Sequence, residues 1–176
     1  MVAINRTPGN DNYLPILGWE MTLARAPHVE FFVQQATIPE ISLPQVDYPN
    51  PLVKQPLSGD HMEYGSLATT FIVDENLQGY SELHDWITGL GFPKDTDQYK
   101  ELADAERDAL NPAGLYSDVS LLLLTSLKNY NIEFIFRDAW PTSMSGWEMD
   151  VTTEEVMFAK CTVTFIYSHF DIEITT

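Results

Sequence analysis

Alternation of apolar and polar residues restricts this chain to a mainly β fold. A period of two places successive side chains on opposite faces of a strand, so that one face can pack against a core. The clearest case is SLATTFIVD at residues 66–74. DVSLLLLT at 118–125 is apolar on both faces, so we expect both to be covered. We predict further strands at 29–37, 41–48 (an edge strand interrupted by Pro44), 132–137, 156–168 and 170–175.

One helix pattern follows the strand that ends near Asp74. Tyr80, Leu83 and Ile87 recur at i, i+3 and i+7, and the GLGFP stretch that comes next supplies a stop signal. A weaker helical pattern lies in an acidic insertion at about residues 94–111. Strands on both sides of one helix indicate a β-sandwich or barrel with the helix packed on one side.

The length of 176 residues suits a single domain spanning 1–176, with an N-terminal extension at about 1–27. No window approaches the roughly 18 apolar residues that a membrane span needs. The N-terminus has no basic run followed by an apolar segment, which argues against a secretory signal. We therefore expect a cytosolic product without a membrane partner.

Motifs for catalysis or cofactor binding are missing from the sequence. It contains no phosphate-binding loop, no dinucleotide fingerprint and no HExxH. Ser81, His84 and Asp85 are the residue types of a catalytic triad, but His84 and Asp85 are adjacent on a helix and point in different directions. We expect no catalytic residue, no cofactor and no metal site, and hence no enzyme.

Several other residues could suggest a site, but packing explains them better. Cys161 falls on the apolar side of the strand AKCTVTFIYSHF, which predicts a small buried side chain, and the four tryptophans are expected to pack. DTDQYKELADAE resembles part of a calcium loop, but Lys100 stands where that loop needs glycine. A calcium- or carbohydrate-binding β-sandwich remains the alternative of another class. A hydrolase with an unrecognised acid pair is a third possibility.

Residues 48–65 (YPNPLVKQPLSGDHMEYG) combine turn formers with apolar side chains. Prolines restrict the free segment and so lower the entropy lost when it docks. Apolar side chains on such an arm would be buried by a neighbouring subunit. We predict an inter-subunit interface, with an internally packed loop as the alternative. The interface residues are Tyr48, Pro49, Pro51, Leu52, Val53, Lys54, Pro56 and Leu57.

Three landmarks occur in a characteristic order over about residues 28–174. They are FFVQQATIPEISLPQV, then SGDHMEYGSLATTFIVDENLQGYSELHDWI, then FRDAWPTSMSGWEMDVTTEEVMFAKCTVTFIYSHFDI. This order resembles the tail tube proteins of contractile-tailed bacteriophages. The shared features are an Ala-x-x-Pro strand end, a Gly-Asp before a Phe-rich strand, an acidic cap before a helix with Trp, an aromatic-Pro-Thr/Ser turn and a final aromatic strand.

The resemblance implies a hexameric ring that stacks into a hollow tube, inside a contractile sheath, through which DNA is ejected. The implied partners are the sheath, baseplate and tail terminator proteins, and the implied location is the virion tail, assembled in the host cytoplasm. The arm would pack on neighbouring subunits, and Lys54 would pair with an acid across that joint. The extension and the insertion suit a baseplate ring that initiates the tube equally well, and a secretion-system tube protein is similar in fold.

The negative net charge of the chain limits how it can interact with DNA. The chain carries 26 acidic and 9 basic residues, for a formal net charge of -17. Such a surface is a poor nucleic-acid ligand, because phosphate binding requires a basic footprint. The charge fits plain solubility, which is its commonest cause, or a cationic partner. Acids facing a channel would instead repel phosphates, so that DNA could pass without adhering.

Overall fold

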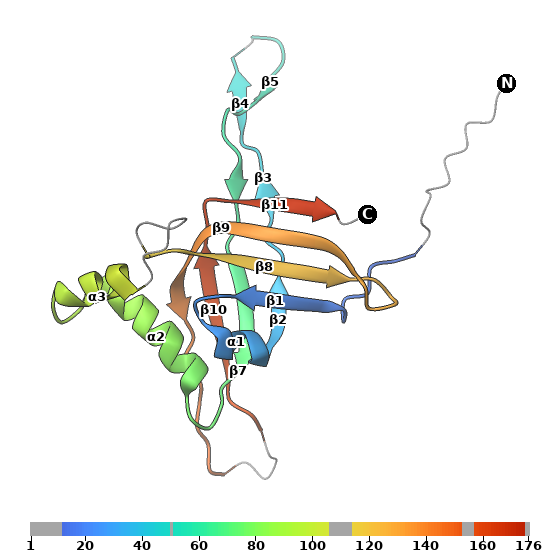
Figure 1. Cartoon of the computed structure of the whole chain (residues 1–176). Coiled ribbons are helices and arrows are strands. Elements are labelled where there is room, and N and C mark those ends of the chain that lie inside the picture. Colours follow the sequence, from blue (N-terminus) through green and yellow to red (C-terminus); the bar gives the residue numbers. More distant parts are fainter. Residues whose placement is uncertain (1–11, 50, 106–113, 153–156, 175–176) are drawn as a thin grey trace.

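The computed structural model of the protein describes residues 12–49, 51–105, 114–152 and 157–174. Its main sheet is antiparallel with the strand order β1-β8-β9-β10-β7-β2, and β11 pairs with β9 (Figure 1). The bounds of these strands are β1 Trp19–Leu23, β2 Val33–Thr37, β7 Leu67–Ile72, β8 Ser117–Leu124, β9 Tyr130–Met144, β10 Lys160–Ile166 and β11 His169–Ile174. The predicted mainly β class is confirmed.

Four short strands and three helices complete the described structure. The strands β3 Ile41–Ser42, β4 Gln45–Tyr48, β5 Gln55–Ser58 and β6 Glu63–Tyr64 form a projecting arm (Figure 1). The helices are α1 Pro27–Phe32, α2 Gln78–Gly91 and α3 Asp97–Ala105. Among the described residues, no helix is long and apolar enough to span a membrane.

Strand β9 belongs to two layers of the sheet. Its first part pairs with β8 and β11, and its last part pairs with β10. In Figure 1, β1, β8, β9 and β11 run across the view, whereas β2, β7 and β10 run nearly at right angles to them. The sheet thus folds over on itself in an orthogonal packing, with the core between the layers.

The core is built from the alternating positions of these strands. Phe71, Phe136 and Phe165 from three different strands are buried, and Trp86 of α2 joins them. Cys161 is fully buried, as predicted, and this burial raises the pKa of its thiol. Because the thiol rather than the thiolate is favoured, Cys161 is a packing residue.

The strand predicted at 29–37 is wrong in its first part, because residues 27–32 form α1. Pro27 stands in the first helical turn, where its fixed φ angle suits a helix. Ala26 and Val29 are both fully buried, and their spacing of three places them on the same side of a helical turn. The apolar run VEFFV is compatible with either structure when it is considered alone.

Other predicted elements differ from the structure mainly in their limits. Strand β9 continues through Pro141, which was expected in a turn, and Pro141 faces Phe165 of β10 in the ladder. β8 has one buried face, but Leu122 on the other face is only half-buried, so the predicted cover of both faces is incomplete. The run at 41–48 divides at Pro44 into β3 and β4. Residues 156 and 175 lie outside the described residues.

The two predicted helices are present, and they pack on each other. Trp86 of α2 is buried and donates its indole N–H to the carbonyl of Leu115 at 2.9 Å. Leu102 of α3 packs against Gly89, where a Cβ atom would lie only 2.9 Å from the Leu102 side chain. The predicted insertion therefore contains a helix, and its residues 106–111 lie outside the described ranges. Residues 19–23 of the predicted extension form β1 and belong to the sheet.

Asp74 caps the first turn of α2. Its carboxylate accepts the backbone N–H groups of Gln78 at 3.1 Å and Gly79 at 3.3 Å. The hydrogen bond from Gln78 is the main reason why the pKa of Asp74 is lowered from its usual value of 3.8. Because the folded-state pKa is the lower one, this stabilisation is present above about pH 4 and is lost as the pH falls through the folded-state pKa.

We expect Asp74→Asn to lower the melting temperature at pH 7, because a neutral amide is a weaker acceptor at a helix N-terminus. The difference from the wild type should shrink as the pH is lowered from 7 to 3. Thermal melts followed by circular dichroism would measure it. Asp85→Asn, on the exposed face of the same helix, is the control. A difference that does not change with pH would contradict this role of the carboxylate.

Candidate assembly surfaces

The arm extends away from the body of the protein as a two-part hairpin (Figure 1). Near the base, Ile41 of β3 faces Tyr64 of β6. Further out, β4 pairs with β5, from Gln45 opposite Ser58 to Tyr48 opposite Gln55. Every residue of β4 and β5 is exposed. Backbone pairing therefore holds the arm in shape although no core covers it.

The residues predicted for an interface all lie in the outer part of this arm. Leu52 is 89% exposed, Val53 is 68% exposed, and Tyr48 and Leu57 are about half exposed. Pro56 lies in β5, opposite Asp47, and Pro49 and Pro51 flank the tip. The alternative of an internally packed loop is wrong, because these apolar side chains are exposed in the single chain. Their contact with a neighbouring subunit stays a prediction.

Lys54 has an acidic partner within its own hairpin. Its Nζ lies 3.6 Å from Oδ2 of Asp47, and both side chains are more than half exposed. An exposed ion pair of this kind is worth little, because water screens it. Lys54 can therefore exchange this partner for another carboxylate at small cost.

The base of the arm is fixed by close backbone contacts. Gly59 donates its N–H to the carbonyl of Pro44 at 2.7 Å, and Gly65 donates to the carbonyl of Glu40 at 2.9 Å. A Cβ atom on Gly59 would lie 2.5 Å from the Pro44 oxygen, so glycine is required there. Tyr64 packs edge-on against Phe170 of β11, which joins the base of the arm to the core.

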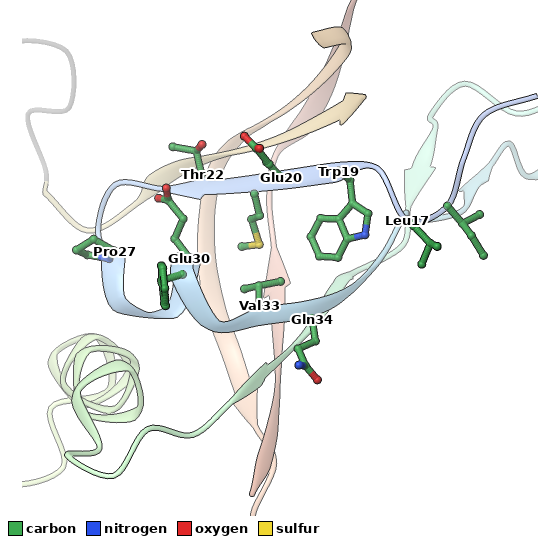
Figure 2. A pocket seen from close by; sticks show the side chains of 11 residues that line it. Leu17, Trp19, Glu20, Thr22, Pro27, Glu30, Val33 and Gln34 are labelled. Atoms are coloured by element: carbon green, nitrogen blue, oxygen red, sulfur yellow. The ribbon is translucent and has the colours of Figure 1, made fainter. Parts of the chain in front are cut away.

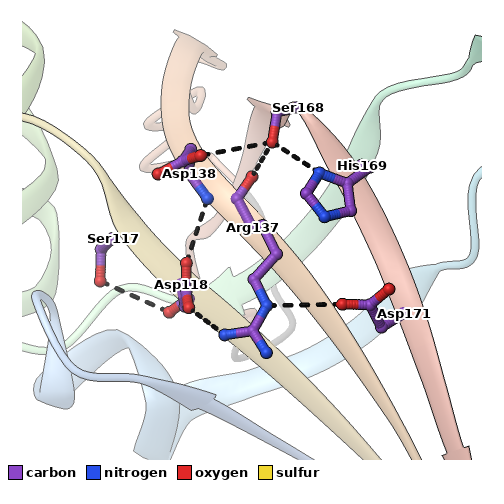
Figure 3. A network of polar contacts seen from close by, with 7 residues as sticks. All are labelled: Ser117, Asp118, Arg137, Asp138, Ser168, His169 and Asp171. Carbon is purple, nitrogen blue, oxygen red and sulfur yellow. Dashed lines mark hydrogen bonds and ion pairs between the residues drawn. The ribbon is translucent and has the colours of Figure 1, made fainter. Parts of the chain in front are cut away.

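A polar network stabilises the point where β9 passes between the layers (Figure 3). Asp138 has a φ angle of 53°, and its N–H is bound by Asp118 at 3.1 Å. Arg137 donates to Asp118 at 2.6 Å and lies 3.6 Å from Asp171 of β11. The bond to Asp118 is the main reason why the pKa of Arg137 is raised. The network thus holds β8, β9 and β11 together at the bend.

The outward face of β1, β8, β9 and β11 is acidic. Register places Glu20, Leu122, Glu133 and Glu173 in one row across the four strands. Asp118 and Asp171 lie on the same face, and Arg137 pairs with both. Three carboxylates of the row therefore give this face a negative character.

A groove of about 650 Å³ separates the edges of β1 and β2, the two ends of the strand order (Figure 2). Trp19 and Met21 of β1 and Val33 of β2 line it, and Glu30 of α1 closes one end by accepting the N–H of Leu23 at 3.1 Å. Ile16, Leu17 and Phe31 at its rim are more than 80% exposed. The main sheet is therefore open on this side.

The residues that could suggest a catalytic or metal site are Ser81, His84 and Asp85 of α2, the acidic side chains and the tryptophans. His84 Nδ1 lies 3.4 Å from Oδ1 of Asp85, so the expectation that these two side chains point in different directions is wrong. The Ser81 hydroxyl lies 3.5 Å from Oδ2 of Asp85, and all three residues are on the exposed face of α2. Among the described residues, no group of three or more His, Cys, Asp or Glu side chains could hold a metal ion. The four tryptophans all pack in or against the core, as predicted. The arm, the open edges and the acidic face remain as the candidate functional features.

A family model described as "Phage tail tube protein" matches residues 4–173. The chain belongs to the phage tail tube protein family. The tail tube terminator protein of Enterobacteria phage T4 is 28% identical to it over 144 residues, covering 80% of this chain and 76% of the T4 protein. The resemblance inferred from the three sequence landmarks is therefore confirmed.

Solved structures of contractile injection systems share the fold. The tube-terminating cap of the anti-feeding prophage has a TM-score of 0.62 at 15% identity, covering 99% of this chain and 100% of the cap protein. A chain of the PVC sheath/tube terminator structure has a TM-score of 0.61 at 14% identity, covering 93% of this chain and 98% of the other. A chain of the PVC sheath-tube complex has a TM-score of 0.59 at 12% identity, covering 94% of each chain. These structures show that the fold of the chain is shared with tube and tube terminator proteins of contractile injection systems.

Sequence reasoning located the arm but missed the groove and the acidic row. The groove combines residues 16–34 only because α1 turns the chain back between β1 and β2, and α1 was predicted as strand. The acidic row depends on the register of four strands, and single-strand alternation does not reveal it.

We expect Gly59→Ala to distort the arm and to leave the folded body intact, because the added methyl group meets the Pro44 carbonyl. Hydrogen exchange should become faster, by about tenfold or more, in β4 and β5 and stay unchanged in β7 and β10. Gly91→Ala, whose methyl group would meet no neighbouring atom, is the matched control. Unchanged exchange in the arm would show that its base tolerates a side chain there.

Proposed function

We propose that six copies of this protein form the ring that ends the tail tube of a contractile phage tail. The sequence similarity to the T4 tail tube terminator is the observation that carries this proposal. The structural similarity to two tube terminators extends over nearly the whole chain and supports it. Six copies is the number that the resemblance to contractile tail tubes implies. The proposed role is structural, without catalysis.

The arm supports assembly into a ring. Its apolar side chains are exposed, and its backbone is already ordered, so docking on a neighbour costs little entropy. The arm lies on the side of β11, and the groove beside β1 lies away from it (Figure 1). Two different surfaces on separated sides of one chain suit a head-to-tail contact, which closes into a ring when the rotation between copies allows it.

The acidic face supports a channel for DNA. Glu20, Glu133 and Glu173 would recur once in every copy around the ring. A belt of carboxylates repels phosphates at short range, because the Debye length is about 8 Å at physiological salt. We infer that this face lines the channel and lets DNA pass without specific binding.

A subunit of the repeating tube is the second candidate. The name of the matching family and the similarity to the PVC sheath-tube complex favour it. The baseplate ring that initiates the tube is the third, supported in fold by a chain of the anti-feeding prophage baseplate with a TM-score of 0.55 at 13% identity, covering 95% of this chain and 96% of the other. All three roles place the protein in the virion tail, with tube, sheath and baseplate proteins as partners and assembly in the host cytoplasm.

Terminator and tube subunit differ in how many copies a tail carries. For tails that differ in tube length, we expect the copies of this protein per tail to stay constant, at about one ring. Quantitative mass spectrometry against a baseplate protein of fixed copy number would measure the ratio. Copies that rise in proportion to tube length would contradict a terminator and establish a tube subunit.

We expect Leu52→Asp to leave the monomer folded and to prevent ring formation, because it places a charge where a neighbour would bury an apolar side chain. Light scattering would measure the assembled mass, and thermal melts would verify the fold. Leu127→Asp is the matched control, since Leu127 is 80% exposed but lies outside the arm. Rings of unchanged mass in Leu52→Asp would exclude the arm tip from the contact.

A further inference from the structure

The rim of the β1–β2 groove presents apolar side chains on a fixed turn. Ile16 and Leu17 are the central residues of a turn that is closed by the N–H of Gly18 and the carbonyl of Pro15 at 3.4 Å. Their side chains are 87% and 93% exposed. Polar residues and glycine dominate exposed turns, so two aliphatic residues at both central positions indicate a contact surface.

The described residues that line the same groove include no Lys, Arg or His. Glu30 of α1 is the carboxylate at its end, whereas the Glu20 side chain points to the other side of β1 (Figure 2) and accepts a hydrogen bond from the Tyr130 hydroxyl at 2.8 Å. Phe31 adds an exposed aromatic ring at the rim. A matching occupant would therefore combine one positive charge with aliphatic side chains.

The tip of the arm has this composition. Leu52 and Val53 are exposed beside Lys54, whose side chain is 88% exposed. Lys54 is the only lysine or arginine between Arg25 and Lys94. Its exposed pair with Asp47 is readily exchanged for another carboxylate.

The arm of one chain points away from its own groove. Strand β2 leaves the groove at Gln34, and β3 and β4 then continue in the same direction toward the tip (Figure 1). From Gln34 to Tyr48 the chain advances fourteen residues in largely extended form, which spans roughly 45 Å. The tip therefore requires the groove of another chain.

We propose that the arm tip of one copy docks in the β1–β2 groove of the next copy. Leu52 and Val53 pack against Leu17 and Phe31 of that copy, and Lys54 lies beside Glu30. This inference rests on the proposed ring and identifies the surface that receives the arm. The contact is head-to-tail, so each copy donates one arm and receives one.

A cysteine pair tests the contact in the intact protein. The only native cysteine, Cys161, is fully buried, so it does not compete for oxidation. Leu52→Cys combined with Phe31→Cys should give a ladder of covalent oligomers up to the hexamer, because every copy carries both halves of the bridge. Each single variant should give dimers at most. Leu52→Cys with Leu127→Cys is the control pair and should give no ladder.

A charge exchange provides a second readout that does not depend on oxidation. Lys54→Glu and Glu30→Lys should each raise the concentration needed for half-assembly, by about two- to fivefold. The combined variant should return toward the wild-type value, since the pair is restored with the charges exchanged. If the increase in half-assembly concentration for the combined variant equals the product of the two single increases, the contact between these two residues is overturned.

The outcomes separate this inference from the proposed function. Wild-type rings without the Leu52–Phe31 ladder would overturn the docking site and leave the ring intact. A second cysteine pair, Leu17→Cys with Ile174→Cys, tests whether β11 of the next copy occupies the groove instead. Covalent oligomers from this pair, without any from the Leu52–Phe31 pair, would also overturn the docking of the arm tip. A wild-type protein that never assembles would contradict the ring itself.

Discussion

The chain of β9 bends at Arg137 and Asp138, where it passes from one layer of the sheet to the other. One strand serves both layers, so the angle at this point sets how the layers cross and where the core lies. Asp138 adopts a left-handed backbone conformation there, which few residue types tolerate. The carboxylate of Asp118 binds the backbone of the bend and the side chain of Arg137 together. The pairing register on β9 is the same on the two sides of the bend, since Ile166 of β10 faces Trp140 and His169 of β11 faces Arg137.

This bend also separates the surfaces used in the proposed assembly. The layer of β1, β8, β9 and β11 carries the acidic row on its outward face, and the other layer leads from β2 and β7 into the arm. Because the two layers cross, the arm projects past β11 on the side away from the groove (Figure 1). A chain with a projecting element and a receiving groove on separated sides can form a closed ring without any other component.

The sequence predicts those parts of the fold that depend on local pattern. Alternation located the β7, β8 and β10 strands, and helical spacing located α2, because in each case one face packs on the core. Residues 27–32 form a helix instead of a strand because Pro27 and the buried pair Ala26 and Val29 favour a turn of helix, a preference that a short apolar run does not reveal. Prolines beside exposed leucines predicted the arm, whereas the groove required the relative positions of β1, α1 and β2.

Electron microscopy of the purified, concentrated protein, together with its mass by light scattering, would show whether the protein forms single six-fold rings. We expect six-fold rings that remain single, since a terminator binds the tube through one face. Long tubes formed by the protein alone would contradict the terminator role in favour of a tube subunit. A monomer at every concentration, with or without added tail tubes, would contradict the proposed assembly of the protein into rings.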